Sequence, residues 1–319
     1  MATITSSAPA PLTAAPITCA QPGGGFFMGL ELTWGRWRRW YLRRFRPGYV
    51  RAMLDKRQGE CASCPHDIID PRDLKFYRNV CGYWFRDEDD RFRWRGRLRL
   101  ARAGLAELIG FSAILWFLMA ACAAASLIHW AFLIPTPLIL GLWIFIVLFF
   151  RDPERKVPDD PSVVVSPADG TITDVGEVDE PDFPGGRAFR IGMFLSVFNV
   201  HVNRIPRSGR VTNLRYYPGE FLDARHGSAN VRNEQLWIDL EEEGSGRHLR
   251  VKQISGAIAR RIVCWLKLGE AVKIGERLGM IKFGSRTELF LPTGENIEIL
   301  VKVGDVVKGA SSELLRYRG

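Results

Sequence analysis

Histidine and cysteine are both scarce in this chain of 319 residues, which contains five histidines and six cysteines. Six cysteines in a chain of this length do not suggest the disulfide framework of a small secreted protein. The first 30 residues also lack a basic segment followed by an apolar core, so we expect no cleavable signal peptide. A catalytic base of the histidine type must come from this short set of five.

Most of the chain also lacks an excess of charge of either sign. The formal net charge is +9, and residues 1–102 hold 19 of the 44 basic and 10 of the 35 acidic side chains. Residues 103–319 therefore balance, with 25 of each. This balance argues against a nucleic-acid-binding face on the main domain. The positive charge instead precedes an apolar block, as in a membrane-flanking segment.

The N-terminal third divides by composition into two parts. Residues 1–25 are rich in Ala, Pro, Thr and Gly, which predicts a disordered tail. Residues 26–102 form a basic region without an assigned role, in which residues 31–58 have the pattern of a helix. One helix face carries aromatic residues, namely Trp34, Trp37, Tyr41 and Phe45, and arginines occupy much of the rest. The pattern is typical of contact with a membrane surface. The alternative is an amphipathic helix packed on a partner element, with a solvated basic face.

A small group of cysteines lies in the same region. Cys61 and Cys64 form a CxxC pair, which is half of a zinc site, and His66 or Cys81 could add ligands. A second pair at matching spacing is missing. The alternative is a turn with reduced thiols, so we assign no metal ligand from the sequence.

Residues 103–150 give the clearest physical signal in the chain. From Leu105 to Trp130 the only charged residue is Glu107. This run of about 26 residues reaches ~39 Å as a helix, more than the ~30 Å of a bilayer's hydrocarbon core. A second apolar run of about 20 residues follows up to Phe150 and contains two prolines.

Basic residues stand outside both ends of the two runs. The positive-inside rule then predicts a transmembrane helical hairpin in the cell (inner) membrane, with the domain that follows it on the cytoplasmic side. Two alternatives remain open: a buried helical pair in a soluble protein, and one spanning helix followed by an interfacial or re-entrant segment.

From residue 161 onward, short β-rich runs alternate with Gly, Pro and Asp turns. The segments 268–276 and 301–309 each combine apolar alternation, a Gly-Asp or Gly-Glu turn and another strand, like the turns of lipoyl- and biotin-carrier folds. The Met-Lys-Met hairpin that a carrier would need is absent. We therefore expect a β-dominated (α+β) catalytic domain over residues 151–319, with hammerhead or barrel-sandwich-like character.

One short stretch carries the most specific functional signal. Gly284 and Ser285 lie between two strand-like runs, within Met280–Pro292. A Gly-Ser pair alone is usually a turn, but this stretch resembles the self-cleavage site of the phosphatidylserine decarboxylase family, in its short prokaryotic branch. The resemblance extends over roughly residues 137–319.

Two further motifs follow the family order. His201, in the sequence Phe-Asn-Val-His-Val-Asn-Arg, resembles the family's histidine motif. Asp169, in Ser-Pro-Ala-Asp-Gly, resembles the motif whose aspartate completes an Asp-His-Ser triad. Arg204 stands where some longer relatives have a second histidine. Asn233-Glu234 and His226 look like a family segment near the site, and we assign them no catalytic role.

The resemblance implies a mechanism and its partners. Asp169 would orient His201, and His201 would deprotonate Ser285 for attack on the Gly284 carbonyl. Cleavage between 284 and 285 would leave chains 1–284 and 285–319, with Ser285 converted to a pyruvoyl cofactor. A Schiff base with this group would allow phosphatidylserine in the membrane to lose CO2 and become phosphatidylethanolamine. The basic segments would attract an anionic lipid surface, and we expect no nucleic-acid partner.

Two other functions remain possible on the sequence alone. A serine hydrolase would use the same three residues as an ordinary triad in an intact chain. A non-enzymatic, membrane-anchored β-domain scaffold would also leave the chain uncut.

Overall fold

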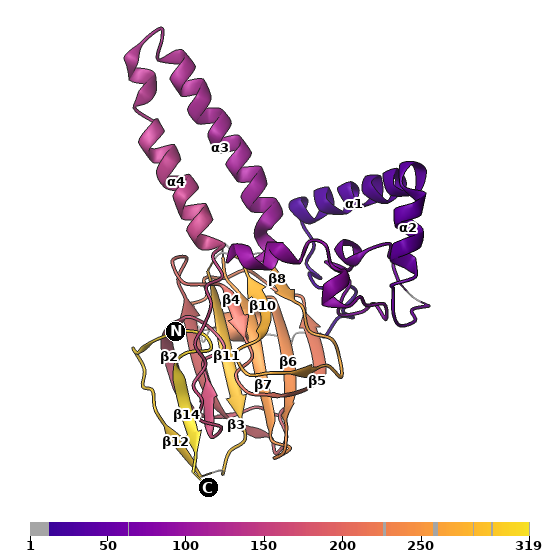
Figure 1. Ribbon diagram of the computed structural model, residues 1–319. Coiled ribbons are helices and arrows are strands. Elements are labelled where there is room, and N and C mark those ends of the chain that lie inside the picture. Colours follow the sequence, from indigo (N-terminus) through magenta and orange to yellow (C-terminus); the bar gives the residue numbers. More distant parts are fainter. Residues whose placement is uncertain are drawn as a thin grey trace, which may run out of the picture. The chain divides into compact units, whose positions relative to one another are not determined.

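The computed structural model describes residues 13–62, 64–225, 228–257, 261–282, 284–294 and 296–318 (Figure 1). The chain forms two compact units. The β unit contains residues 155–196 and 201–319 together with the N-terminal segment up to Gly23. The helical unit contains residues 24–154 and the short segment 197–200. The predicted regions 26–102 and 103–150 thus belong to one unit.

The β unit is built from antiparallel strands, which confirms the β-dominated fold. Among the described residues, the largest sheet has eight strands in the order β13-β2-β3-β11-β7-β6-β5-β9, and Figure 1 shows that it is curled. Its strands are β2 (Gly170–Asp179), β3 (Arg187–Leu195), β5 (Gly209–Tyr217), β6 (Gln235–Glu242), β7 (His248–Ser255), β9 (Ala271–Val272), β11 (Ser285–Leu291) and β13 (Val306–Val307).

Two three-stranded sheets complete this unit. One has the order β1-β14-β12 and contains β1 (Val163–Val165), β12 (Ile297–Ile299) and β14 (Glu313–Tyr317). The other has the order β4-β10-β8 and contains β4 (Val202–Arg204), β8 (Ile262–Cys264) and β10 (Arg277–Ile281). The chain passes from β10 in the small sheet to β11 in the large sheet, and Gly284-Ser285 lies at this crossover.

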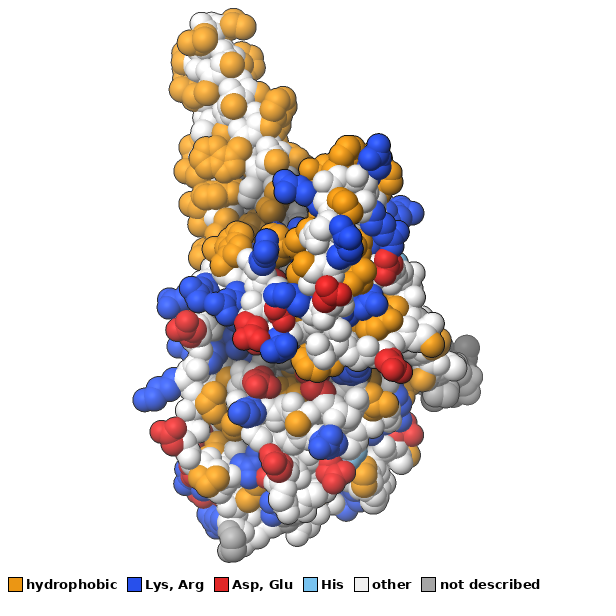
Figure 2. Space-filling view, turned by 45° about the vertical axis from the view of Figure 1, so that its right-hand side comes forward, with side chains coloured by type: hydrophobic (Ala, Val, Ile, Leu, Met, Phe, Trp, Pro, Cys, Tyr) orange, Lys and Arg blue, Asp and Glu red, His pale blue; other side chains and the backbone are white. Residues whose placement is uncertain are grey.

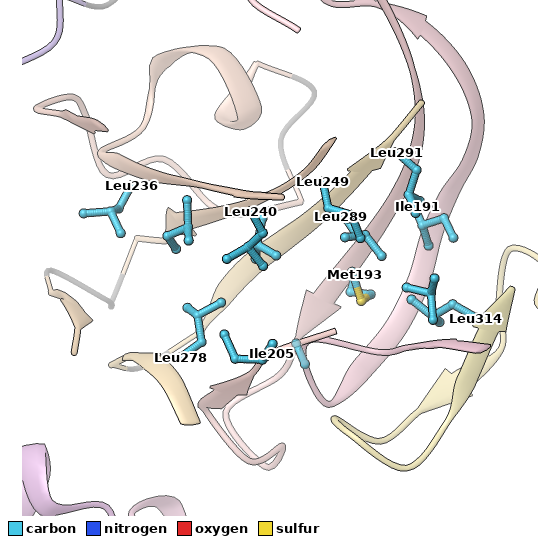
Figure 3. Close-up of a cluster of buried hydrophobic side chains, with 14 of the residues drawn as sticks. Ile191, Met193, Ile205, Leu236, Leu240, Leu249, Leu278, Leu289, Leu291 and Leu314 are labelled. Atoms are coloured by element: carbon cyan, nitrogen blue, oxygen red, sulfur yellow. The ribbon is translucent and has the colours of Figure 1, made fainter. Parts of the chain in front are cut away.

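The core of the β unit lies on one face of the large sheet. Side chains alternate along a strand, so β11 directs Ser285, Thr287, Leu289 and Leu291 to the same side, and all four are buried. Figure 3 shows Leu289 and Leu291 among Ile191, Met193, Leu240 and Leu249 from the neighbouring strands. Burial of each such side chain contributes about 1.5–3 kcal/mol relative to exposure. Ser285 and Thr287 therefore form the polar end of a row that Leu289 and Leu291 continue.

The N-terminal segment packs against the β unit. The Ala15 N–H donates to the Tyr216 carbonyl over 2.7 Å, and the Ala20 carbonyl accepts from the Cys264 N–H over 2.9 Å. Cys19 is also buried. Residues 13–23 therefore correct our prediction of a disordered tail over 1–25, while residues 1–12 lie outside the described part. Ala15 and Ile17 also pack against the core of this unit. The backbone hydrogen bonds are open to every residue type except proline as a donor, so composition does not reveal them.

The helical unit begins with two helices, α1 (Phe26–Phe45) and α2 (Pro47–Leu54), where the sequence predicts one over residues 31–58. The break falls at Arg46, whose φ of −134° is not helical. Steric contact with a following proline disfavours helical geometry, and Pro47 then starts α2 at a position where its missing N–H costs nothing.

Short 3-10 helices follow: η1 (Pro71–Leu74), η2 (Asp87–Asp89), η3 (Arg93–Leu98), η4 (Arg102–Gly104) and, later, η5 (Trp130–Leu133). The two long apolar helices are α3 (Leu105–Ala125) and α4 (Thr136–Phe149). They pack together through Trp116 and Trp143, whose ring centroids are 5.5 Å apart, and Trp143 Nε1 donates to Ser112 Oγ over 3.0 Å.

Both apolar segments are long enough to cross a membrane by length and composition. The candidate spans are Arg102–Ala125, with 24 residues, and Trp130–Phe149, with 20 residues. Figure 2 shows hydrophobic side chains over this helical pair. The exposed ones include Ile109, Phe117, Leu127, Ile128 and Leu138. This exposure argues against the alternative of a buried helical pair.

Candidate active site

The Gly284-Ser285 peptide has the geometry of a reactive bond. Gly284 has φ +67°, the left-handed conformation that glycine adopts without steric cost. Ser285 begins β11 and is fully buried. Among the described residues, its Oγ atom has no hydrogen-bond partner. A buried hydroxyl without a partner loses its hydration, so the fold keeps this nucleophile at a cost.

His201 lies against the same peptide. Its side chain is fully buried, and Nε2 accepts a hydrogen bond from the Gly284 N–H over 3.1 Å. The His201 carbonyl also accepts from the Ile281 N–H over 3.2 Å, which fixes the histidine to the end of β10. Because Nε2 accepts, the neutral ring carries its proton on Nδ1. The structure thus brings His201 and the predicted cleavage peptide together, with the basic nitrogen facing the peptide.

Asp169, the third residue of the predicted triad, is held by contacts that the sequence did not indicate. Arg155 Nη2 donates to both of its carboxylate oxygens, over 2.7 and 2.8 Å. The Gly309 N–H donates to Oδ1 over 2.8 Å. The sequence signal for Arg155 is its place in the segment Arg151-Asp-Pro-Glu-Arg155, which lies inside the region of resemblance. The role of Asp169 in orienting His201 stays a prediction.

A buried amide network supports the histidine strand. Gln253 Nε2 donates to Asn203 Oδ1 over 2.7 Å, and Asn203 Nδ2 donates to Thr287 Oγ1 over 3.2 Å. All three side chains are fully buried. The network joins β4, β7 and β11, so it fixes the strand after His201 to the strand that Ser285 begins. Asn203 follows His201 by two residues in the histidine motif, but nothing in the sequence pointed to its partners.

Gly256 approaches the carbonyl that would be cleaved. A Cβ atom added at Gly256 would lie 2.6 Å from the Gly284 oxygen and 3.2 Å from its carbon. Such contacts are shorter than van der Waals contact. Any residue larger than glycine at position 256 would therefore collide with the Gly284 carbonyl oxygen. Negative charge develops on the same oxygen when a nucleophile attacks the carbonyl, which makes the surrounding space part of the site. Sequence reasoning missed Gly256, which appears there only as a glycine after an apolar strand.

The Asn233-Glu234 segment lies beside the site and braces it. Asn233 Nδ2 donates to the Ser255 carbonyl over 2.7 Å, and Ser255 pairs directly with Ser285 across β7 and β11. Tyr216 Oη donates to Glu234 Oε1 over 2.6 Å, and burial raises the pKa of Glu234 despite this bond. His226 lies outside the described residues. Arg204 Nη1 donates to the Gly275 carbonyl over 3.4 Å.

Comparison with known proteins identifies the family. The family model described as Phosphatidylserine decarboxylase matches residues 142–314. The protein named Phosphatidylserine decarboxylase proenzyme of Rhodopirellula baltica is 45% identical over 246 residues, covering 77% of this chain and 99% of the relative. The protein of the same name from Desulfotalea psychrophila is 42% identical over 215 residues, covering 67% of this chain and 95% of the relative.

These matches, together with the buried serine and histidine at a strand crossover, place the chain among the carboxy-lyases. More particularly, it belongs to the phosphatidylserine decarboxylase family. The family match covers both Asp169 and the 284–285 crossover.

Proposed function

We propose that this chain is a membrane-bound phosphatidylserine decarboxylase that converts its own Ser285 into a pyruvoyl group and produces phosphatidylethanolamine and CO2. One observation carries the proposal: a buried, unpartnered serine hydroxyl follows a left-handed glycine whose N–H donates to His201 Nε2. The name proenzyme, which its relatives carry, supports self-processing. A serine hydrolase and a non-enzymatic scaffold are not favoured, because the relatives are named as decarboxylases.

We infer self-cleavage from three groups, which are the Ser285 hydroxyl, the Gly284 carbonyl and the His201 imidazole. Ser285 Oγ attacks the Gly284 carbonyl carbon, and His201 Nε2 takes the hydroxyl proton. The Ser285 nitrogen leaves the carbonyl and is protonated, so the amide becomes an ester through Oγ. Loss of the Ser285 α-proton then breaks the Cβ–Oγ bond and leaves Gly284 as a carboxylate at the end of chain 1–284. The Cα=Cβ double bond that remains takes up a proton at Cβ, which becomes a methyl group, and water then replaces the nitrogen on the α-carbon to give a ketone and ammonia.

The residues around Ser285 fit the resulting group. It would stand at the start of β11, between Leu195 of β3 and Ser255 of β7, the register partners of Ser285. A ketone conjugated to an amide condenses with the substrate amine and accepts the electron pair released with CO2. The chain itself would hold this end of β11 in place through the Asn203 network and keep His201 beside it.

The helical unit supports a lipid substrate. We propose that α3 and α4 span the inner membrane as a hairpin, because basic residues stand outside both ends of the two segments. The outer ends and the catalytic domain would then lie on the cytoplasmic side. The many exposed apolar side chains on these two adjacent helices support this placement, because lipid tails would cover them.

Helix α1 would lie at the membrane surface beside the hairpin. Its first turn contacts α3 through Phe27 and Phe111, whose ring centroids are 5.2 Å apart. Trp34 and Trp37 are exposed and stack at 4.9 Å, and this aromatic row continues through Tyr41 to Phe45. Aromatic residues favour the interface of a bilayer, and neighbouring arginines attract anionic lipid such as phosphatidylserine.

The test is the mass of the folded, full-length protein purified in detergent. We expect two chains, 1–284 and 285–319, with the second blocked at its N-terminus. Phosphatidylserine in mixed micelles should release CO2. Ser285→Ala should leave one uncut chain without activity. Ser255→Ala is the matched control, because Ser255 is equally buried and is the direct partner of Ser285, so this variant should still be cut.

Three results would contradict the proposal. An uncut wild-type chain labelled on Ser285 by a fluorophosphonate would indicate the hydrolase. An uncut, unlabelled wild-type chain would indicate the scaffold. Normal cutting of Ser285→Ala would show that Ser285 is not the nucleophile.

A further inference from the structure

Three cysteines that the proposed reaction does not use meet in the helical unit. The sulfur atoms of Cys61, Cys64 and Cys81 all lie within 4.8 Å of one another. Cys81 is buried, whereas Cys61 and Cys64 are partly exposed and joined as a disulfide. The sequence allowed either His66 or Cys81 to complete a site with the CxxC pair. The structure selects Cys81, since His66 is not part of this set and packs edge-on against Tyr77.

The fold brings the three cysteines together by a close backbone contact. Gln58 and Trp84 form an antiparallel bridge, with hydrogen bonds of 2.9 and 3.0 Å between their backbone groups. Inside this bridge, a Cβ atom added at Gly82 would collide with the Glu60 carbonyl. A Cβ atom at Gly59, which has φ +78°, would collide with the Gly82 carbonyl. The two glycines thus let the segments that carry Cys61 and Cys81 approach each other.

We propose that Cys61, Cys64 and Cys81 in their reduced form bind a zinc ion, with a solvent molecule in the fourth position. Zinc is bound by thiolates at about 2.3 Å, which places sulfur atoms about 3.8 Å apart in a tetrahedral site. Sulfurs already within 4.8 Å need only a small adjustment to reach this spacing. A site of three thiolates and one open position selects a thiophilic, tetrahedral cation over magnesium or calcium.

Metal binding requires reduction of the Cys61–Cys64 bond. A thiol reductant supplies two electrons and two protons and is itself oxidised to a disulfide. The zinc ion then displaces three protons from the three thiols to solvent, leaving a centre with a formal charge of −1. Residues 24–102, which belong to the same unit as the cysteines, carry 19 basic and 10 acidic side chains, a formal net charge of +9 that offsets this charge. The cytoplasmic location proposed for this region favours thiols over disulfides.

The ion would cross-link the two ends of a long loop. The bridge at Gln58 and Trp84 closes a loop whose interior contains few large buried apolar side chains, among them Ile68 and Ile69. A metal centre at the base of such a loop supplies stability that a small core does not. The proposed function of the β unit does not depend on this centre.

The test uses full-length protein in detergent, reduced with a phosphine, freed of the reductant without oxygen and titrated with Co²⁺. We expect a thiolate-to-cobalt charge-transfer band that an equal amount of Zn²⁺ removes, and one zinc per chain by elemental analysis. Cys81→Ser should lose the band. Cys122→Ser is the matched control, a cysteine of the same unit outside the cluster, and should keep it. Protein left oxidised should bind no cobalt.

Cys61→Ser and Cys64→Ser guard against misfolding of the buried Cys81 variant, because both positions are partly exposed. Each should lose the band while the same sample is still cut at position 285. Failure of the reduced wild-type protein to bind metal would overturn the proposal. So would a Cys81→Ser variant that binds cobalt as tightly as the wild type. Because cutting is scored in every sample, failure of the metal site and failure of the decarboxylase proposal are distinguishable.

Discussion

The two units of this protein depart in opposite ways from the rule that apolar side chains lie inside a fold and polar ones outside. The β unit keeps polar groups in its interior, among them His201, Asn203, Gln253, Ser285 and Thr287, all at 0% exposure. The helical unit instead exposes large apolar side chains on α3 and α4, such as Phe117 at 73% and Leu138 at 79%. A buried polar group costs free energy unless it is hydrogen-bonded, and a large exposed apolar patch marks a surface that binds a partner or a membrane.

Within the β unit, buried polar groups that are paired differ from the one to which we assign chemistry. In the β unit, Arg250 is almost fully buried and bonds Asp239 over 2.5 Å, and Lys252 bonds Glu180 over 2.9 Å. Burial would raise the pKa of Asp239, but the hydrogen bond from Arg250 and the positive charges of Arg250 and Arg215 lower it to about 2. These charges are paired and need no further explanation. Ser285 has one polar side-chain atom and no partner for it among the described residues, and that is the group assigned to chemistry.

The largest effect expected on this comparison comes from His201. If the polar interior serves chemistry, His201→Ala should slow self-cleavage about 10²–10⁴-fold, because the serine hydroxyl loses its base. The rate is measured as loss of the uncut chain on a denaturing gel after synthesis without cells. The control is His248→Gln. His248 belongs to the same unit, but its Nε2 lies 3.6 Å from Asp239 Oδ1 and not beside the cleaved peptide, so this variant should be cut at the normal rate. A normal cutting rate in His201→Ala would show that the buried histidine is not the base and has only a structural role.

The sequence indicated the reactive peptide and its base because each is marked by local residue types. Gly284-Ser285 and His201 each lie in a short motif. A hydrogen bond from the Gly284 N–H to His201 Nε2 joins the two motifs in the structure. Gly256 and Asn203 were missed because their roles arise from contacts across the fold. Asn203 bonds Thr287, 84 residues later, and Gly256 meets the Gly284 carbonyl across two strands. No local pattern encodes such a contact.

The same limit applies to the fold. Alternating apolar residues and glycine turns predicted strands over the C-terminal half, and long apolar runs predicted α3 and α4. Strand order did not follow, because β11 pairs with β3 and β7, which lie far apart in the chain. The prediction of a disordered N-terminal tail failed over residues 13–23 for a related reason. Backbone hydrogen bonds hold these residues to strands more than 190 residues away in the chain. Pairing between distant segments depends on the whole fold.

A smaller effect is expected from Gly256, and it asks how closely the interior is fitted to the reaction. Gly256→Ala places a methyl group 2.6 Å from the Gly284 oxygen, so the peptide must shift. A displacement of about 1 Å at a reacting group costs on the order of 10²-fold in rate. Cutting should slow by that factor while the chain remains folded. Hydroxylamine, which cleaves an ester directly, should not restore the rate if the acyl shift itself is impaired.

The control for this variant is Gly209→Ala. An added Cβ at Gly209 collides with the Glu241 carbonyl, a backbone strain of the same kind, but at the edge of β5 away from the site. Both variants should lower the melting temperature. Only Gly256→Ala should also slow cutting, and equal cutting rates would show that Gly256 acts through stability alone.

The smallest effect tests the exposed side of the comparison. Arg44 lies in the last turn of α1, next to the aromatic row. A basic residue near an anionic membrane surface contributes about 1 kcal/mol, so Arg44→Gln should raise the apparent KM for phosphatidylserine about fivefold at low salt. The value of kcat should not change, because the proposed hairpin would still anchor the chain and the reacting groups are untouched. High salt should shrink the difference, since it screens surface charge. Arg187→Gln removes an equally exposed arginine from the β unit and should leave KM unchanged. If both variants shift KM alike, the effect reflects total charge, and α1 then has no particular place at the lipid surface.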